Sequence, residues 1–253
     1  DDVHERLPHV RPHCLPGRRC VARAARGRLR DEGGQVVGKL GRGRQCGKDA
    51  AFANAVSTLY ANIGFMGVDD PLCTVVVTST VPEEGKSTIA LALARAMAAS
   101  GKRTLLLECD LRRRSLARMA GVRPDIGWGA VAVGDAALRR AVSPAGGENL
   151  FLLDAEPDLP SPADLLDSAR FRALFDTLAR TFDYVVVDTP PVGAFVDAAV
   201  VASQADATVL VVREGYVRGE GVARACAQLE QAGANVVGVA MNFCSSSPSP
   251  EGR

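Results

Sequence analysis

The stretch Thr78-Ser-Thr-Val-Pro-Glu-Glu-Gly-Lys-Ser-Thr88 decides the fold of this chain. The residues before it, Cys73–Thr78, are mostly apolar and β-branched, which predicts a buried parallel strand. The residues after it, Ser87–Ser100, have the composition of a helix, and Gly101 is placed to end that helix. Free backbone amides and the helix dipole make such a strand-to-helix loop a phosphate-binding site, so the stretch predicts a P-loop.

Each residue of the loop has an expected role in binding ATP with Mg²⁺. Gly85 lets the backbone approach the phosphates, and the Lys86 ammonium reaches the β- and γ-phosphates. The Ser87 hydroxyl is placed to bind Mg²⁺, and the Thr88 hydroxyl to reach the α-phosphate. The predicted nucleotide-binding residues are therefore Glu84, Gly85, Lys86, Ser87, Thr88 and, further along the chain, Asn242. The match to the general pattern is partial, because Thr80 stands where the first glycine is expected.

Acidic residues end two further predicted strands. Glu108 and Asp110 follow one apolar run, and Asp188 follows another. Because ligands bind at the carboxyl ends of strands in open α/β sheets, we expect these acids to converge near the phosphates. Asp188 is predicted to hold Mg²⁺, and Asp110 to bind Mg²⁺ or accept a proton. The predicted metal ligands are Ser87, Asp110 and Asp188, and the predicted catalytic residues are Lys86, Asp110, Asp188 and Glu108. A single strand-end acid can also be a helix N-cap.

The rest of the chain alternates strands with helices, which predicts one α/β domain with a mostly parallel sheet covered by helices on both faces. We expect this domain to span 48–243, with a first helix at Ala50–Phe65 and a last strand at Val236–Met241. Residues 1–47 are rich in Arg and Gly and lack periodicity. They read as a disordered basic arm, as an arm that touches anionic lipid or nucleic acid, or as an artefact of gene prediction. The Ser/Pro-rich residues 244–253 are expected to be a disordered tail.

Composition narrows the classes of partner. The net charge is +1, which gives no global reason to expect a nucleic-acid partner. The seven cysteines form no CxxC pair, which favours a reduced cytoplasmic protein. No apolar run approaches the roughly 18–20 residues that span a bilayer.

Linked motifs give this sequence a family resemblance between about residues 50 and 243. The motifs are Asn62-Ile63, Phe65, Thr78-Ser79, Pro82, Gly85–Thr88, Asp110-Leu-Arg112, Pro160–Ser168 and Asp188-Thr-Pro-Pro191. Together they resemble the bacterial tyrosine kinases (BY-kinases) of capsule and exopolysaccharide synthesis. The resemblance implies an ATP-dependent protein-tyrosine kinase that phosphorylates protein tyrosines, itself included. It also implies ring-like homo-oligomers and a membrane activator of the polysaccharide chain-length-regulator type, which would hold the protein at the inner face of the plasma membrane.

Several positions depart from that family's pattern. Glu83 replaces a glycine of the loop, where a carboxylate is expected to crowd the phosphates or strain the turn. Glu108 replaces the first aspartate of D-x-D. Asn54, Ser57 and Tyr60 stand where the charged assembly motif is expected, which leaves oligomer formation open. The tail has no tyrosine, so self-phosphorylation on a tail cluster is not expected. Of the three tyrosines, Tyr60 and Tyr184 are expected to pack, and Tyr216 is a minor candidate phosphoacceptor.

Two alternatives remain open. One is a nucleotide-binding regulatory subunit with little catalysis, suggested by Glu83, Glu108 and the changed assembly motif. The other is a spatial-organisation ATPase of the partition kind, which resembles this fold closely. Such ATPases carry a signature lysine five residues before the P-loop lysine, where this chain has Val81. For Asn242, the alternative to an adenine contact is an ordinary turn residue.

Overall fold

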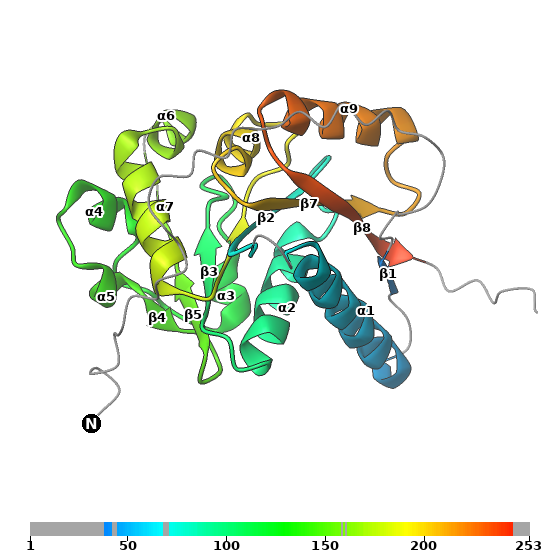
Figure 1. Cartoon of the computed structure of the whole chain (residues 1–253), viewed down its shortest axis with the longest axis horizontal. Coiled ribbons are helices and arrows are strands. Elements are labelled where there is room, and N and C mark those ends of the chain that lie inside the picture. Colours follow the sequence, from blue (N-terminus) through cyan, green and yellow to red (C-terminus); the bar gives the residue numbers. More distant parts are fainter. Residues whose placement is uncertain (1–37, 42–44, 68–70, 158, 160, 245–253) are drawn as a thin grey trace, which may run out of the picture.

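An eight-stranded sheet forms the centre of the computed structural model, which describes residues 38–41, 45–67, 71–157, 159 and 161–244, with side chains from residue 50 onward. The strands lie in the order β1-β8-β7-β2-β6-β3-β5-β4 (Figure 1). Their bounds are β1 Gly38–Gly41, β2 Thr74–Ser79, β3 Thr104–Glu108, β4 Ser143–Pro144, β5 Leu150–Leu153, β6 Tyr184–Asp188, β7 Ala207–Arg213 and β8 Val236–Cys244. All neighbours pair in parallel except β4 and β5, so the predicted mostly parallel sheet is confirmed.

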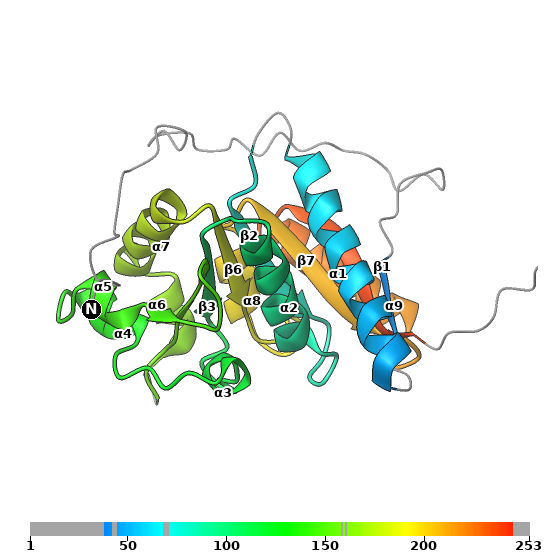
Figure 2. The same cartoon turned by 90° about the horizontal axis from the view of Figure 1, so that it is seen from below.

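Helices cover both faces of this sheet, because the strands carry apolar side chains in both directions. On one face, Val75 and Val77 of β2 pack with α1, α2 and α3, whereas Val76 faces the cluster formed by α4 and α6 to α9. Figure 2 shows α1 and α2 crossing the first of these faces. The helix bounds are α1 Gln45–Met66, α2 Lys86–Ala99, α3 Leu116–Ala120, α4 Trp128–Val133, α5 Leu138–Ala141, α6 Pro162–Leu166, α7 Ala169–Thr181, α8 Asp197–Ala202 and α9 Gly219–Gln231.

The predicted elements differ from the observed ones mainly at the ends of the sheet. Helix α1 begins at Gln45 and β1 pairs with β8, so the last part of the expected arm 1–47 contains a strand and the start of a helix. Most of that arm, 1–37, and nearly all of the expected tail 244–253 lie outside the described residues. The last strand continues three residues beyond its predicted end, to Cys244. Among the helices that the structure describes, none is long and apolar enough to cross a bilayer.

The topology places the phosphate loop at the middle of the sheet. Strand β2 lies between β7 and β6, and the loop leaves its carboxyl end to begin α2. Strand β6 lies between β2 and β3, with Glu108 of β3 directly opposite Asp188 of β6. The acidic strand ends are therefore neighbours at the edge of the sheet where α2 begins, as the sequence predicted.

Candidate phosphate and metal site

The loop between β2 and α2 depends on two residues with positive φ. Gly85, the N-cap residue of α2, has φ of 89°, and Glu83 has φ of 68°. A Cβ atom at position 85 would lie 2.2 Å from the Asn242 amide nitrogen, so both the dihedral angle and the space require glycine there. Glu83 has no such freedom. The expected backbone strain at this exposed glutamate is therefore present.

Glu84 fastens the loop to the neighbouring strand through a fully buried carboxylate. One oxygen accepts a hydrogen bond from the Val81 amide at 2.9 Å, and the other accepts one from the Arg213 amide at the end of β7 at 3.0 Å. Because both carboxylate oxygens are occupied, only the backbone of Glu84 remains for the predicted nucleotide contact. The side-chain role was missed from the sequence, although a glutamate that reaches back three residues to a free amide is the pattern of a capping box.

Asn242 completes the attachment of the loop. Its amide nitrogen donates to the Glu84 carbonyl at 2.9 Å, and its side-chain oxygen accepts from the Phe243 amide at 2.9 Å. Both ends of the carboxamide therefore have protein partners at the end of β8. A contact between Asn242 and adenine stays a prediction.

The Lys86 ammonium lies between two carboxylates. It is 2.7 Å from Asp110 Oδ2 and 3.5 Å from Asp188 Oδ1, and it donates to the Ser87 hydroxyl at 3.2 Å. Burial lowers the pKa of Lys86, but the charges of Asp188 and Asp110 outweigh burial and the net effect is a raised pKa. The structure thus brings four predicted residues together, from β2–α2, β3 and β6. Thr88 lies beside them in the first turn of α2, with an exposed side chain.

Asp188 offers two buried carboxylate oxygens as ligands for a divalent cation. The residue is completely buried, and neither carboxylate oxygen has a hydrogen-bond partner among the described residues. Burial raises the pKa of Asp188 to about 6, while Lys86 and the nearby Ser87 hydroxyl act in the opposite direction. Oxygen ligands of this kind suit Mg²⁺, and two carboxylates facing one ammonium leave a negative charge for the cation to balance. Ser87, Asp110 and Asp188 therefore fit a magnesium ion.

Glu108 has a structural role at the end of β3. One of its oxygens accepts from the Asp110 amide at 3.0 Å, and the other accepts from the Ser115 and Leu116 amides at 2.8 and 3.1 Å. The carboxylate thereby shapes the loop that carries Asp110 and caps α3. Burial and the like negative charge of Asp188, which faces Glu108 across the sheet, raise the pKa of Glu108 well above its usual range. The three amides oppose that rise. Both oxygens are thus engaged by backbone, which does not favour the predicted catalytic role.

Two contacts that sequence reasoning missed hold the surrounding loops. The indole nitrogen of the buried Trp128 donates to the Glu108 carbonyl at 2.9 Å. The Gly193 amide donates to the Thr80 carbonyl at 3.2 Å, and a Cβ at position 193 would lie only 2.4 Å from that carbonyl oxygen. The loop after β6 therefore packs directly against the phosphate loop. The Thr-Pro-Pro-Val-Gly sequence of that loop was the available signal, because glycine permits such close approach.

Arg112, part of the Asp110-Leu-Arg112 motif, joins the loop after β3 to α8. Its Nε donates to the buried Asp197 at 3.1 Å, and its guanidinium carbon lies 4.1 Å from the centre of the Phe195 ring. An ion pair and a cation–π contact together fix the side chain. The loop that presents Asp110 is thus attached on one side to α3 and on the other to α8.

The geometry defines the class of protein: an ATPase-like α/β domain with a phosphate loop, a loop lysine and strand-end carboxylates. The sequence model of the family described as ATPase MipZ matches residues 73–227. Two solved structures share the fold, with 26% and 28% sequence identity to this chain. The chimerical protein CapA2B2 is 26% identical, with a TM-score of 0.77 over 83% of this chain and 95% of that one. The kinase domain of Escherichia coli tyrosine kinase ETK is 28% identical, with a TM-score of 0.74 over 80% and 81%.

Sequence relatives narrow the class to one family. The tyrosine-protein kinase CpsD of Streptococcus pneumoniae is 36% identical over 187 residues, which cover 74% of this chain and 82% of that protein. This chain belongs to the bacterial tyrosine kinases, as its motifs indicated.

Proposed function

We propose that this chain transfers the γ-phosphoryl group of ATP to protein tyrosines. The observation that carries the proposal is the position of Lys86, held within 3.5 Å of both Asp110 and Asp188 at the first turn of α2. A lysine there can move to the β- and γ-phosphates, and the carboxylates can then serve the metal ion and the acceptor. Membership of the bacterial tyrosine kinases supports tyrosine as the acceptor.

Different groups of the site bind the phosphates, neutralise charge and accept the proton during phosphoryl transfer. Amides at the start of α2 bind the phosphates, and Lys86 neutralises charge that develops on the transferred group. The tyrosine oxygen attacks the γ-phosphorus, the bond from that phosphorus to the bridging oxygen breaks, and ADP leaves. Asp110, released by Lys86, orients the tyrosine hydroxyl and accepts its proton.

Ser87 and Asp188 are the residues that would hold Mg²⁺, and Asp110 would be a further ligand when it does not accept the tyrosine proton. When bound, the ion would supply positive charge that balances the charge of the phosphates. The oxygens of Asp188 support this assignment. They are fully buried, make no hydrogen bond among the described residues, and share the Lys86 ammonium, 3.5 Å from Oδ1, with Asp110, so a second cation would offset the remaining negative charge.

The cellular setting follows from the family resemblance. We propose that the kinase regulates capsular or exopolysaccharide synthesis and export, next to a membrane activator of the chain-length-regulator type. Such a partner would hold it at the inner face of the plasma membrane. The matched chimerical protein CapA2B2 and the kinase relatives support this setting.

The alternatives differ from this proposal in measurable ways. A partition-type ATPase would hydrolyse ATP without forming phosphotyrosine, and Val81 at the position of its signature lysine argues against it. A regulatory subunit would bind nucleotide with little transfer. The strained Glu83 is the feature that favours it, since its carboxylate belongs to the phosphate loop.

The test is incubation of the full chain with γ-labelled ATP and Mg²⁺, with and without the cytoplasmic tail of a candidate activator. An acidic copolymer of glutamate and tyrosine serves as an added acceptor, and mass spectrometry locates phosphotyrosine. Lys86→Ala is the inactive control. Phosphotyrosine that disappears with Lys86→Ala supports the proposal, whereas nucleotide binding with no phosphotyrosine on any acceptor overturns it.

A further inference from the structure

Arginines lie on two sides of the phosphate loop, in loops that leave the same edge of the sheet. Strand β2, which leads into the phosphate loop, has β7 as one neighbour and β6 as the other, and β3 lies beyond β6. The loop after β3 carries Arg113, and the loop after β7 carries Arg218. Because these strands are parallel, both loops leave the carboxyl edge of the sheet, where Lys86 also lies. The site therefore has positive charge on two opposite sides.

On the β3 side, Arg113 belongs to the loop that presents Asp110. One oxygen of the Asp110 carboxylate accepts a hydrogen bond from the Arg113 amide at 3.0 Å, and the other lies 2.7 Å from Lys86. The arginines directly before and after Arg113 each pair with an aspartate, one on α8 and one after β5. Arg113 itself is exposed and forms no ion pair among the described residues. It therefore offers an unpaired positive charge on the loop of the proposed proton acceptor.

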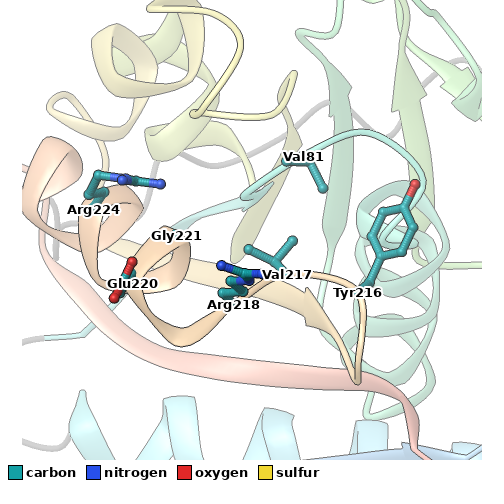
Figure 3. Close-up of a pocket in the computed structure, with 7 residues that line it drawn as sticks. All are labelled: Val81, Tyr216, Val217, Arg218, Glu220, Gly221 and Arg224. Atoms are coloured by element: carbon teal, nitrogen blue, oxygen red, sulfur yellow. The ribbon is translucent and has the colours of Figure 1, made fainter.

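On the β7 side, a hollow of about 530 Å³ lies between the start of α9 and the phosphate loop. Figure 3 shows Arg218 and Arg224 on the α9 side of this hollow, with Val81 of the phosphate loop across from them. Both arginines are exposed, and within the described part of the chain neither forms an ion pair. Glu220 is the one acidic residue of the lining. The hollow thus has a net positive charge beside the phosphate loop.

An apolar spot lies between these two positive sides, on the loop after β6. Val196, the N-cap residue of α8, is 55% exposed. Phe195 before it is half-buried, and its ring contacts the Arg112 guanidinium. The same loop touches the phosphate loop through the hydrogen bond from the Gly193 amide to the Thr80 carbonyl. Such a spot suits the ring of an aromatic side chain, because contact removes apolar surface of both partners from water.

We propose that the acceptor tyrosines of this kinase lie in acidic segments, with acidic residues both before and after the tyrosine. Arg113 would bind the acids on one side, and Arg218 with Arg224 those on the other. The tyrosine ring would pack on Val196 between them. The inference rests on the proposed kinase activity and defines the class of substrate for the same site.

The distribution of charge favours an acidic peptide over a continuous polyanion. Glu83 is exposed in the phosphate loop, between the two positive sides. Nucleic acid or an anionic membrane would bring negative charge to Glu83 as well as to the arginines, and like charges repel. A peptide can instead place its acids at the two ends and the neutral tyrosine in the middle.

The test compares four acceptor peptides with the full chain, ATP and Mg²⁺. Each peptide has one tyrosine, with glutamates on both sides, before it only, after it only, or replaced throughout by glutamines. We expect kcat/KM for the doubly acidic peptide to exceed that for the glutamine peptide about 25-fold, since each side supplies about fivefold, the factor of a favourable exposed ion pair. Equal kcat/KM for the four peptides would overturn this inference and leave the kinase function intact. No phosphotyrosine on any peptide would overturn both.

Substitutions assign each positive side to one end of the peptide. Arg113→Gln should lower the 25-fold preference to about fivefold, and Arg218→Gln with Arg224→Gln should do the same. Each of these proteins should lose its preference for one of the two singly acidic peptides and keep it for the other. Arg170→Gln, an exposed substitution on α7, is the matched control and should keep the whole preference. An unchanged preference in every variant would contradict the role given to the arginines.

A peptide that cannot react measures binding apart from chemistry. The doubly acidic peptide carries phenylalanine in place of tyrosine and a fluorophore, and anisotropy gives its Kd with the full chain, ADP and Mg²⁺. Val196→Ser should weaken binding about fourfold, the effect of one CH₂ group removed from apolar contact. Val133→Ser on α4, also at an exposed valine, is the control. An equal Kd for both variants would contradict the contact with the ring, and an equal Kd for acidic and glutamine peptides would overturn the proposal.

Discussion

Replacing Asp188 with asparagine tests the electrostatics of the site through protein stability. In the folded chain, burial raises the pKa of this carboxyl from 3.8 to about 6. A raised pKa means that the folded state binds more protons than the unfolded state between about pH 4 and pH 6. Stability from this group therefore falls as pH rises through that window. The full cost, about 3 kcal/mol, is present above about pH 6 and absent below about pH 4.

Asp188→Asn should remove this pH dependence, because an amide does not titrate. The free energy of unfolding of the variant relative to the wild type should increase by about 3 kcal/mol from pH 4 to pH 7. Part of the change passes through Glu108, which lies opposite Asp188 and whose pKa the Asp188 charge raises. Removal of that charge lowers the pKa of Glu108, so both groups shift the result in the same direction.

The assay is urea unfolding at a series of pH values without nucleotide or Mg²⁺. Asp176→Asn on α7 makes the same change at an exposed position and serves as the control. A constant difference between Asp188→Asn and wild type across the series would refute the argument. Added Mg²⁺ at about ten times its Kd should stabilise the wild type by about 1.4 kcal/mol. That gain should be absent in Asp188→Asn.

Three further predictions concern the phosphate loop. Glu83→Gly should raise stability by about 0.5–1 kcal/mol and tighten ATP binding, measured by thermal unfolding and titration, with Glu83→Gln separating charge from backbone. Unchanged stability would show that the φ of this residue costs nothing. Gly85→Ala should lower the free energy of unfolding by at least about 1–2 kcal/mol. Adding Asn242→Ala to this variant should restore only part of the loss, because the backbone strain at position 85 persists. Full restoration in a double-mutant cycle would contradict that account. Glu84→Gln should lower the free energy of unfolding, measured in urea, by about 1–3 kcal/mol, because the new side-chain NH₂ group would face a backbone amide donor. An unchanged free energy of unfolding would refute the role of Glu84 in fastening the loop.

Periodicity and loop chemistry predict much of this fold from the sequence. Buried parallel strands such as Thr74–Ser79 are continuous apolar runs, and the loop before α2 has the Gly-Lys-Ser-Thr signature. The pairing of β1 with β8 was missed, because Gly38–Gly41 is short and its sequence has no hydrophobic alternation. The two-residue β4 was missed because it is too short for any period.

The candidate site was predictable where residue type and strand position agree. Lys86, Asp110 and Asp188 meet because the topology of parallel sheets brings their strand ends together. The assignment of Glu108 as catalytic was based on its charge and its place at the end of a strand, and it stays a prediction. Its oxygens face the amides of a loop whose path depends on tertiary packing against Trp128, and residue spacing carries no information on that path.

The contact between Lys86 and Asp110 couples nucleotide binding to release of the proton acceptor. While Lys86 Nζ stays 2.7 Å from Asp110, the ammonium does not reach a γ-phosphate and the carboxylate is occupied. ATP therefore competes with Asp110 for Lys86, and Asp110 becomes available only with the donor in place. Asp110→Asn should tighten ADP binding about tenfold without Mg²⁺, because one charged partner of Lys86 is lost, while phosphoryl transfer falls. Calorimetry measures the first effect and labelled ATP the second. Weaker ADP binding in Asp110→Asn would show that the ion pair prepares Lys86 for the phosphates and does not compete with them.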